Sequence, residues 1–322
     1  MAGFALRRIH DLASDRDAAD ARARALLPKV AARHEWFFRC HDPEGTGLVA
    51  IIHPWESGRD NSMDWDAALA RVPTEDVEPF IRRDTQLANP AHRPTQGDCE
   101  RYIALVQTFR DLGWDNAKLH DASPFRVVDP GLNTILIRSC SDLAVVADAL
   151  GETAIARLSR DLAERDLVAL DTPWNDAHGQ YLSFDRVADT PVESPSVGGL
   201  LLVFAAVPKA RVASIAHRIE TLADWARHMV PSHDPAEPGF DGKRYWRGPL
   251  WLIVNYLIAD GLNTGGEIRI AERIVRDSLA LIDRSGFAEY YDPITGEPFG
   301  GGRFTWTAAM VIEFLTRDRE TT

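Results

Sequence analysis

Aromatic, glycine and charged residues are concentrated in three short segments of the sequence. They cover residues 53–62 (HPWESGRDNS), 244–251 (RYWRGPLW) and 287–308, which contains FAEYYDPITGE and GGRFTWTA. Aromatic rings give a flat apolar surface on which a sugar ring can stack, and neighbouring charged groups can bind its hydroxyls. The three segments therefore predict a pocket for a carbohydrate.

Two carboxyl groups in these segments could perform hydrolysis. Cleavage of a glycosidic bond uses a pair of carboxyl groups, one of which stays protonated so that it can donate to the leaving oxygen. Asp60 and Glu289 are the best-placed candidates. Taken alone, Asp60 is also explained as a helix N-cap and Glu289 as a solvated loop carboxylate. Because one is early and the other late in the chain, they can act together only in a closed or nearly closed fold.

The charged residues beside these carboxyl groups have two interpretations each. Glu56 either binds a sugar hydroxyl or orients Arg59. Arg247 either binds the substrate or pairs with Glu56 or Asp60, and such a pair would change the pKa of the general acid.

The aromatic residues of the second segment fit either the sugar pocket or the hydrophobic core. Tyr245 and Trp246 precede Gly248 and Pro249 on an expected loop, which favours a place in the pocket. Trp251 begins an expected helix, so the hydrophobic core explains it as well as the pocket does.

Helical periodicity dominates the rest of the chain. Apolar residues recur at spacings of three and four around residues 27–37, 102–112, 129–146, 155–162, 215–225, 251–258 and 268–282. The apolar run 197–207 predicts a buried helix, and 47–52 has the pattern of a strand. The sequence thus predicts a single all-α domain over residues 1–322, with roughly ten helices arranged as consecutive hairpins.

Capping residues predict where several of these helices begin and end. Pro28 is expected near the start of the first helix, and Asp129 is expected to cap the helix that follows it. Gly261 and Gly286 are expected to end the helices that precede them.

Charge, cysteine content and hydropathy narrow the range of partners. Lys and Arg number 36 and Asp and Glu number 48, a net charge of −12, so we expect no binding to nucleic acid or to a membrane through a basic surface. The three cysteines are far apart and no HxxxH pair occurs, so we expect no disulfide and no metal site. With neither a signal-peptide pattern nor an apolar stretch of ~20 residues, a cytoplasmic location is expected. The oligomeric state is not indicated.

The three motifs, in this order, resemble glycoside hydrolase family 63 over roughly residues 25–317, and most closely its bacterial mannosylglycerate and glucosylglycerate hydrolases. The resemblance implies an (α/α)6 toroid whose loops form a sugar pocket at one rim. It also implies hydrolysis of α-glycosides with inversion and without a cofactor. In this interpretation Asp60 is the general acid and Glu289 is the general base.

The resemblance also implies contacts with the substrate, a small α-glucoside or α-mannoside such as glucosylglycerate or mannosylglycerate. It assigns pocket positions to Tyr245, Trp246 and Trp251, and to Arg93 in the segment HRPT. The full set of candidate substrate-binding residues is Trp55, Glu56, Arg59, Arg93, Tyr245, Trp246, Arg247 and Trp251. Cys99 lies where the glucosylglycerate hydrolases have a substrate-facing aromatic residue, which leaves the sugar preference open.

Family members usually have further helices before the segment equivalent to residues 26–28. We therefore expect a toroid that lacks its first helices, with an open side that exposes apolar helix faces and lowers stability and activity.

Other functions are also compatible with parts of this pattern. A related enzyme on the same fold would hydrolyse trehalose or α-gluco-oligosaccharides. A non-catalytic sugar-binding remnant would have little reason to keep Asp60 and Glu289 within their motifs. A sugar epimerase on the same toroid would need paired histidines in the pocket, which these motifs lack.

Overall fold

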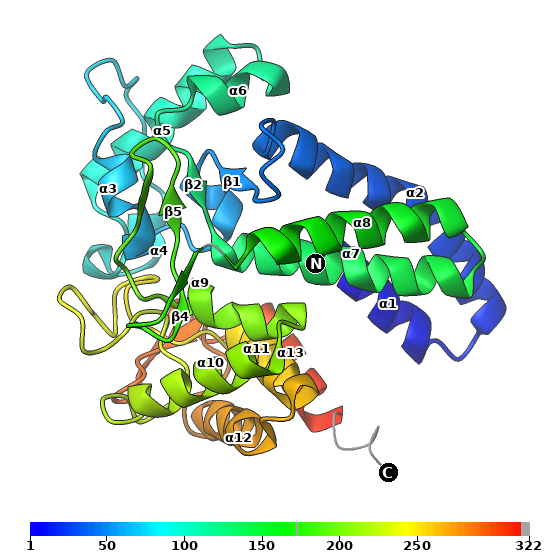
Figure 1. Cartoon of the computed structure of the whole chain (residues 1–322). Helices are drawn as coiled ribbons and strands as arrows, with labels where there is room; N and C mark the ends of the chain where they lie inside the picture. The colour runs from blue at the N-terminus through cyan, green and yellow to red at the C-terminus, as the bar shows by residue number, and fades with distance from the viewer. Residues whose placement is uncertain (172, 317–322) are drawn as a thin grey trace.

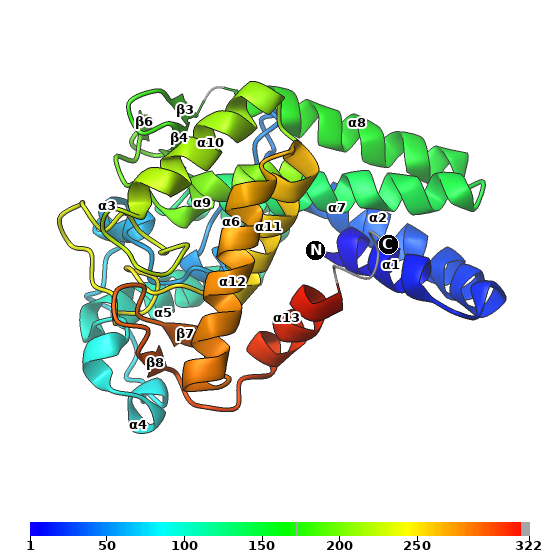
Figure 2. The same cartoon turned by 90° about the horizontal axis from the view of Figure 1, so that it is seen from below.

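The computed structural model describes residues 1–171 and 173–316, and long helices dominate it (Figure 1). One group of packed helices consists of α1 (Ala2–Leu12), α2 (Arg16–His41), α7 (Pro130–Ala149) and α8 (Thr153–Ala169). A second group consists of α10 (Lys209–Leu222), α11 (Leu252–Gly265), α12 (Ile268–Ser285) and α13 (Thr305–Thr316). The short helix α9 (Val197–Leu200) and the 3₁₀ helix η4 (Leu201–Ala205) pack between them (Figure 2).

Shorter elements carry the loops between these groups. They are η1 (Pro54–Ser57), η2 (Met63–Trp65), α3 (Asp66–Leu69), α4 (Asp84–Leu87), η3 (Pro90–His92), α5 (Gln96–Asp111) and α6 (Asn116–Ala122). The main hydrophobic core contains residues from near both ends of the described chain, including Phe4 and Phe314.

Capping residues explain where the helices begin, and the start of the first predicted helix differs from the expectation. The Asp129 carboxylate accepts a hydrogen bond from the Gly131 amide at 2.9 Å, so the predicted start of α7 is confirmed. In contrast, α2 begins at Arg16 behind an Asp15 N-cap, and Pro28 lies inside it. An interior proline costs about 3 kcal/mol, and the buried face of α2 offsets that cost by packing on α7.

Helix α11 is longer than its sequence pattern suggests. It passes through Gly261, ends at Gly265 and is capped by Gly266, which has a left-handed φ of 94°. A Cβ on Gly261 would lie 2.4 Å from the carbonyl carbon of Val203. Gly261 is therefore a point of close helix approach to η4 and not the predicted helix end.

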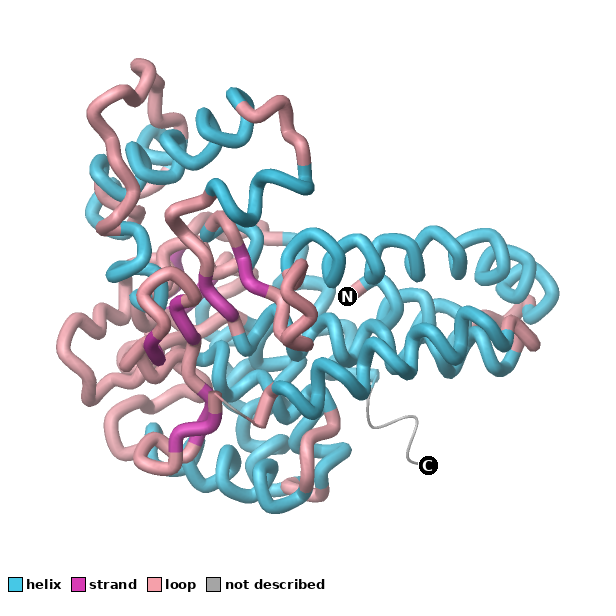
Figure 3. The backbone as a smooth tube through the Cα atoms, turned by 45° about the horizontal axis from the view of Figure 1, so that its top comes forward, coloured by secondary structure: helices cyan, strands magenta, loops and turns pink. Residues whose placement is uncertain are grey.

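The strands are two residues long and lie beside the loops at one end of the molecule (Figure 3). The antiparallel sheet has the order β1 (Ala50–Ile51), β2 (Val127–Val128), β5 (Phe184–Asp185) and β6 (Thr190–Pro191). Two hairpins complete the set, β3 (Trp174–Asn175) with β4 (Gln180–Tyr181), and β7 (Tyr290–Tyr291) with β8 (Pro298–Phe299). The strand expected at 47–52 is thus confirmed in part, and it leads directly into the first aromatic segment.

The last described helix carries exposed apolar side chains. On α13, Trp306, Ile312 and Leu315 are 61%, 64% and 61% exposed. Exposed apolar faces of this kind were expected of a toroid with an open side.

None of the helices in residues 1–171 and 173–316 has the length and apolar character that a membrane span requires.

The close contact at Gly261 makes a specific prediction. We expect Gly261→Ala to destabilise the protein by about 1–3 kcal/mol, because the new methyl group would meet backbone atoms of Val203 and Phe204 that cannot rotate away. Urea unfolding followed by circular dichroism measures the change.

Gly97→Ala is the matched control in another helix. Its new Cβ would meet only the end of the flexible Arg101 side chain at 3.2 Å, so stability should be unchanged or slightly higher. Equal stability of the two variants would contradict the close-approach explanation.

Candidate active site

The first aromatic segment is organised by hydrogen bonds between the side chains of His53 and Glu56 and nearby backbone groups. His53 caps η1, because its Nδ1 accepts from the Trp55 amide at 3.1 Å while its Nε2 lies 3.0 Å from the Tyr102 carbonyl. Burial lowers the pKa of His53 to about 4, so the ring is neutral and its Nε2–H donates to that carbonyl. The Glu56 carboxylate accepts from the amides of Ile52 and His53 at 2.7 and 3.3 Å. Glu56 therefore orders this loop, and it makes no hydrogen bond or ion pair with Arg59, which was one of the two partners considered for it.

Arg59 is buried, which differs from the expected contact with a substrate. Its guanidinium donates to Asp129 at 2.8 Å and to Asp64 at 3.1 Å, and also to the hydroxyls of Ser62 and Ser196. The side chain is only 4% exposed. Although burial raises the pKa of Asp64, Arg59 and the serine hydroxyls outweigh it and lower that pKa overall. Arg59 therefore holds the interior together and does not face the site.

Asp60 follows Arg59 directly and is fixed through its backbone. Its carbonyl oxygen accepts a hydrogen bond from the Tyr102 hydroxyl at 2.6 Å. The next residue, Asn61, donates from Nδ2 to the Tyr245 carbonyl at 2.9 Å and so ties this loop to the second aromatic segment. Burial raises the pKa of the Asp60 carboxyl group, and the charge of Arg93 partly opposes that rise.

Glu289 is also fixed through the backbone around it. Its amide donates to the Phe299 carbonyl at 3.0 Å, and the Thr307 hydroxyl donates to the Ala288 carbonyl at 2.6 Å. Its side chain lies against Gly300, where a Cβ would be 2.2 Å from Oε2 and where φ is 75°. Only glycine suits this position, because it tolerates the positive φ and leaves room for the carboxylate.

Tyr245 and Arg93 each interact electrostatically with both carboxyl groups. The Tyr245 hydroxyl is 3.5 Å from Oε1 of Glu289, and the Arg93 guanidinium stacks 4.5 Å above the Tyr245 ring. Burial and the nearby charge of Asp60 raise the pKa of Glu289, while Arg93 and Tyr245 oppose the rise. The structure thus brings Asp60, Glu289, Arg93 and Tyr245 into one electrostatically coupled group.

Of the three tryptophans proposed to bind substrate, Trp55 is exposed, whereas Trp246 and Trp251 form a buried pair. Trp55 is 52% exposed and contacts the Tyr102 ring at 5.9 Å, so one of its faces is free for a ligand. Trp246 and Trp251 stack 4.2 Å apart with an interplanar angle of 5°, and both are buried. They pack against Tyr245, and both belong to the main hydrophobic core.

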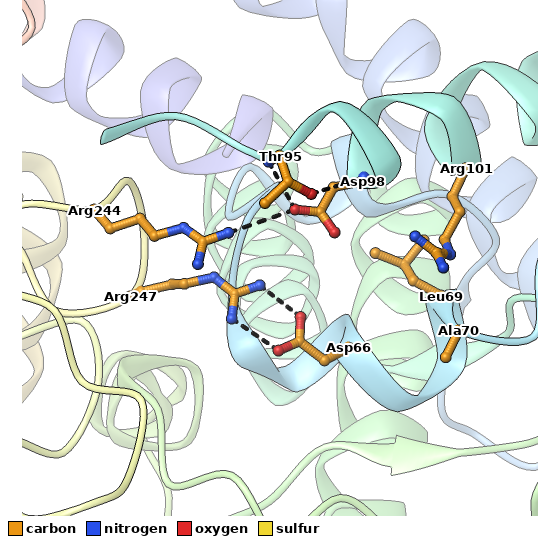
Figure 4. Close-up of a pocket in the computed structure, with 8 residues that line it drawn as sticks. All are labelled: Asp66, Leu69, Ala70, Thr95, Asp98, Arg101, Arg244 and Arg247. Carbon is orange, nitrogen blue, oxygen red and sulfur yellow. Dashed lines mark hydrogen bonds and ion pairs between the residues drawn. The ribbon is translucent and has the colours of Figure 1, made fainter. Parts of the chain in front are cut away.

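Arg247 pairs with a different partner from the two that we considered. It forms a bidentate ion pair with Asp66 at 2.6 and 2.8 Å. Beside it, Arg244 approaches Asp98 to 3.5 Å (Figure 4). These pairs line a polar cavity of about 280 Å³, and neither Asp60 nor Glu289 is among its lining residues.

Sequence reasoning missed residues that position the carboxyl groups. Tyr102 belongs to an apolar helical pattern that indicated only core packing, and Thr307 lies in a motif that gave it no role.

Cys99 lies near Asp60, and burial raises its pKa to about 11, so it is a neutral thiol. Within residues 1–171 and 173–316, no group of three or more His, Cys, Asp and Glu side chains could hold a metal ion.

Two carboxyl groups of raised pKa beside aromatic rings on a helical scaffold are features found in glycoside hydrolases. Comparison with known proteins gives the family. Residues 1–307 match the model of the mannosylglycerate hydrolase MGH1-like glycoside hydrolase domain. The chain therefore belongs to this family of glycoside hydrolases, within family 63.

The relatives extend the comparison to complete proteins. Mannosylglycerate hydrolase of Thermus thermophilus is 42% identical over 97% of this chain and 75% of its own length. Mannosylglycerate hydrolase MGH1 of Selaginella moellendorffii is 43% identical over 98% of this chain, and the chain spans 65% of that relative. Glucosylglycerate hydrolase of Mycolicibacterium hassiacum is 28% identical over 88% of this chain and 65% of its own length.

A solved structure confirms the fold. The GH63 mannosylglycerate hydrolase from a second strain of Thermus thermophilus, solved with Tris and D-glycerate, superposes with a TM-score of 0.94 at 42% identity, over 98% of this chain and 76% of that one. The family and the all-α toroid expected from the sequence are thus confirmed. The family match begins at residue 1 and ends at 307, whereas the motifs indicated 25–317.

The buried position of Arg59 makes a prediction about stability. We expect Arg59→Met to cost about 3–5 kcal/mol, because it leaves Asp64 and Asp129 buried without their cation. Arg24→Met is the control, because Arg24 and its partner Glu152 are both exposed, so the loss of their ion pair should cost less than about 1 kcal/mol. Urea unfolding of both variants measures the difference, and equal losses would contradict the structural role of Arg59.

Proposed function

We propose that this protein is an inverting α-glycosidase that hydrolyses mannosylglycerate or glucosylglycerate, with Asp60 as general acid and Glu289 as general base. The observation that carries the proposal is the coupling of these two carboxyl groups through Tyr245 and Arg93. The names of the relatives support the substrate class, because they are hydrolases of mannosylglycerate or of glucosylglycerate.

The electrostatics of the site suit the two roles. A general acid must hold its proton at neutral pH, and burial raises the pKa of Asp60 in that direction. A general base must be ionised, and although burial raises the pKa of Glu289 overall, the Tyr245 hydroxyl and Arg93 limit that rise by favouring the ionised form. In the reaction, Asp60 donates its proton to the glycosidic oxygen, and Glu289 takes a proton from the water that attacks the opposite face of the sugar.

The substrate-binding residues follow from the same geometry. Trp55 offers an exposed ring on which the sugar can stack, and Tyr245 lies beside Glu289 with Trp246 and Trp251 packed against it. A glycerate carboxylate needs a cation in a chain with a net charge of −12, and Arg93 supplies one beside both catalytic groups. Arg59 and Arg247 are occupied by Asp129 and Asp66 and are not part of this proposal.

The three cysteines, all free thiols, support a reducing compartment such as the cytoplasm.

The first prediction of this proposal concerns the carboxyl groups. We expect the wild-type protein to release sugar from mannosylglycerate or glucosylglycerate, and Asp60→Asn and Glu289→Gln each to lose at least about 100-fold in kcat. Trehalose is included in the panel to test the alternative trehalase-like activity. Coupled assays of free mannose and glucose measure turnover.

Glu297→Gln is the control for these two variants. Glu297 lies in the same part of the chain, is exposed, and forms an ion pair with Lys243, so its loss should leave kcat unchanged. Binding of the glycosides without turnover by the wild-type protein would favour the non-catalytic alternative, and full activity of either carboxyl variant would refute its assigned role.

The second prediction concerns stereochemistry. Because inversion places the attacking water opposite the leaving group, an α-glycoside should first release the β-anomer of the sugar. Proton NMR spectra recorded faster than mutarotation identify the first product. Initial release of the α-anomer would show retention and would overturn the inverting mechanism without touching the assignment of the family.

A further inference from the structure

Tyr102 lies behind the proposed general acid without facing the substrate. We propose that Tyr102 is a positioning residue that holds the Asp60 carboxyl group in line with the glycosidic oxygen. This inference rests on the proposed function, because it concerns the proton that Asp60 donates.

Tyr102 connects both ends of the Asp60 loop to a single helix. Its hydroxyl donates to the Asp60 carbonyl at 2.6 Å, and its own carbonyl accepts from His53, at the beginning of the loop, at 3.0 Å. Helix α5 carries Tyr102 and is fixed at its N-terminus by a capping box of Thr95 and Asp98. The loop from 53 to 60 is therefore fastened at its start and at its catalytic end to one rigid element.

The backbone contact matters because the aspartate side chain is short. One methylene group separates the Asp60 carboxyl from the backbone, so a shift of the peptide moves the carboxyl group with it. Misplacement of a reacting group by 1 Å can cost on the order of 100-fold in rate. Gly58, with a φ of 71°, lies in the same loop and adds no side chain to restrain it.

The phenol of Tyr102 is suited to this task and not to proton transfer. Tyr102 is 2% exposed, and burial raises the pKa of its hydroxyl, which therefore stays a neutral donor. Its one hydroxyl proton is occupied by the Asp60 carbonyl. Tyr102 also supports the exposed ring of Trp55 in an edge-to-face contact at 5.9 Å, so the same residue orients the acid and one wall of the site.

The test compares substrates that differ in their need for the acid. Tyr102→Phe removes one oxygen and keeps the ring. We expect kcat on the glycerate glycoside to fall about 10- to 100-fold with KM within about twofold. On the corresponding α-glycosyl fluoride, whose leaving group needs little protonation, we expect a loss of less than about threefold.

The pH profile gives a second readout. Release of the loop would hydrate the Asp60 carboxyl group and lower its raised pKa toward the ordinary value. Because the general acid must be protonated, the basic limb of kcat should then move to lower pH. In the Asp60→Asn background, Tyr102→Phe should have no further effect on hydrolysis of the fluoride.

Tyr256→Phe is the matched control. Tyr256 is another buried tyrosine, and its hydroxyl donates to Glu313 at 3.1 Å, between α11 and α13. All variants are assayed below their melting temperatures. Tyr256→Phe should lower the melting temperature without changing the ratio of rates on the two substrates.

Three results would overturn the proposal for Tyr102. They are an equal loss on both substrates, an unchanged basic limb, and failure of Tyr102→Phe to fold, which would show a structural role alone. Failure of the proposed function is distinct from all three, since it would appear as a wild-type protein without turnover or an active Asp60→Asn variant.

Discussion

The active end of this molecule depends on one buried guanidinium. Arg59 donates to Asp129, which caps α7, and to Ser196, which caps α9, while it also pairs with Asp64. A single side chain thus joins the first aromatic loop to the starts of two helices that are far apart in the sequence. Because an unpaired buried charge is costly, these elements can separate only if several hydrogen bonds are lost together.

Hydrogen bonds to the backbone fix the positions of both proposed catalytic groups. Asp60 follows Arg59 and is fixed by Tyr102, whereas Glu289 is fixed by a short hairpin and by Thr307 at the start of α13. The hydrogen bond from Asn61 to the Tyr245 carbonyl connects the first aromatic segment to the second. Loops with little regular structure therefore hold their carboxyl groups precisely, because each loop is anchored to a packed helix on at least one side.

The sequence predicts the parts of this structure that depend on local pattern. Helix α7 follows from its cap and its periodicity, and the aromatic motifs identify the loops that meet. Apart from the strand expected at 47–52, the strands could not be predicted, because each has two residues and most depend on partners from distant segments. Gly261 looks like a helix end, since a sequence cannot show that another backbone lies 2.4 Å from its missing Cβ. Arg59 and Arg247 look like substrate ligands for the same reason, because their partners Asp129 and Asp66 are brought to them only by the fold.

The pairing of Arg59 also bears on the chemistry proposed for its neighbour. A free guanidinium one residue from Asp60 would favour the ionised carboxylate and lower its pKa, which is the opposite of what a general acid needs. In the folded chain, two carboxylates neutralise Arg59 and the interior encloses it. The pKa of Asp60 is then governed by burial, with Arg93 as the opposing charge. Arg93 also acts on Glu289, so one cation restrains both pKa values, while the Arg59 cluster supplies rigidity and its carboxylates offset the charge of Arg59.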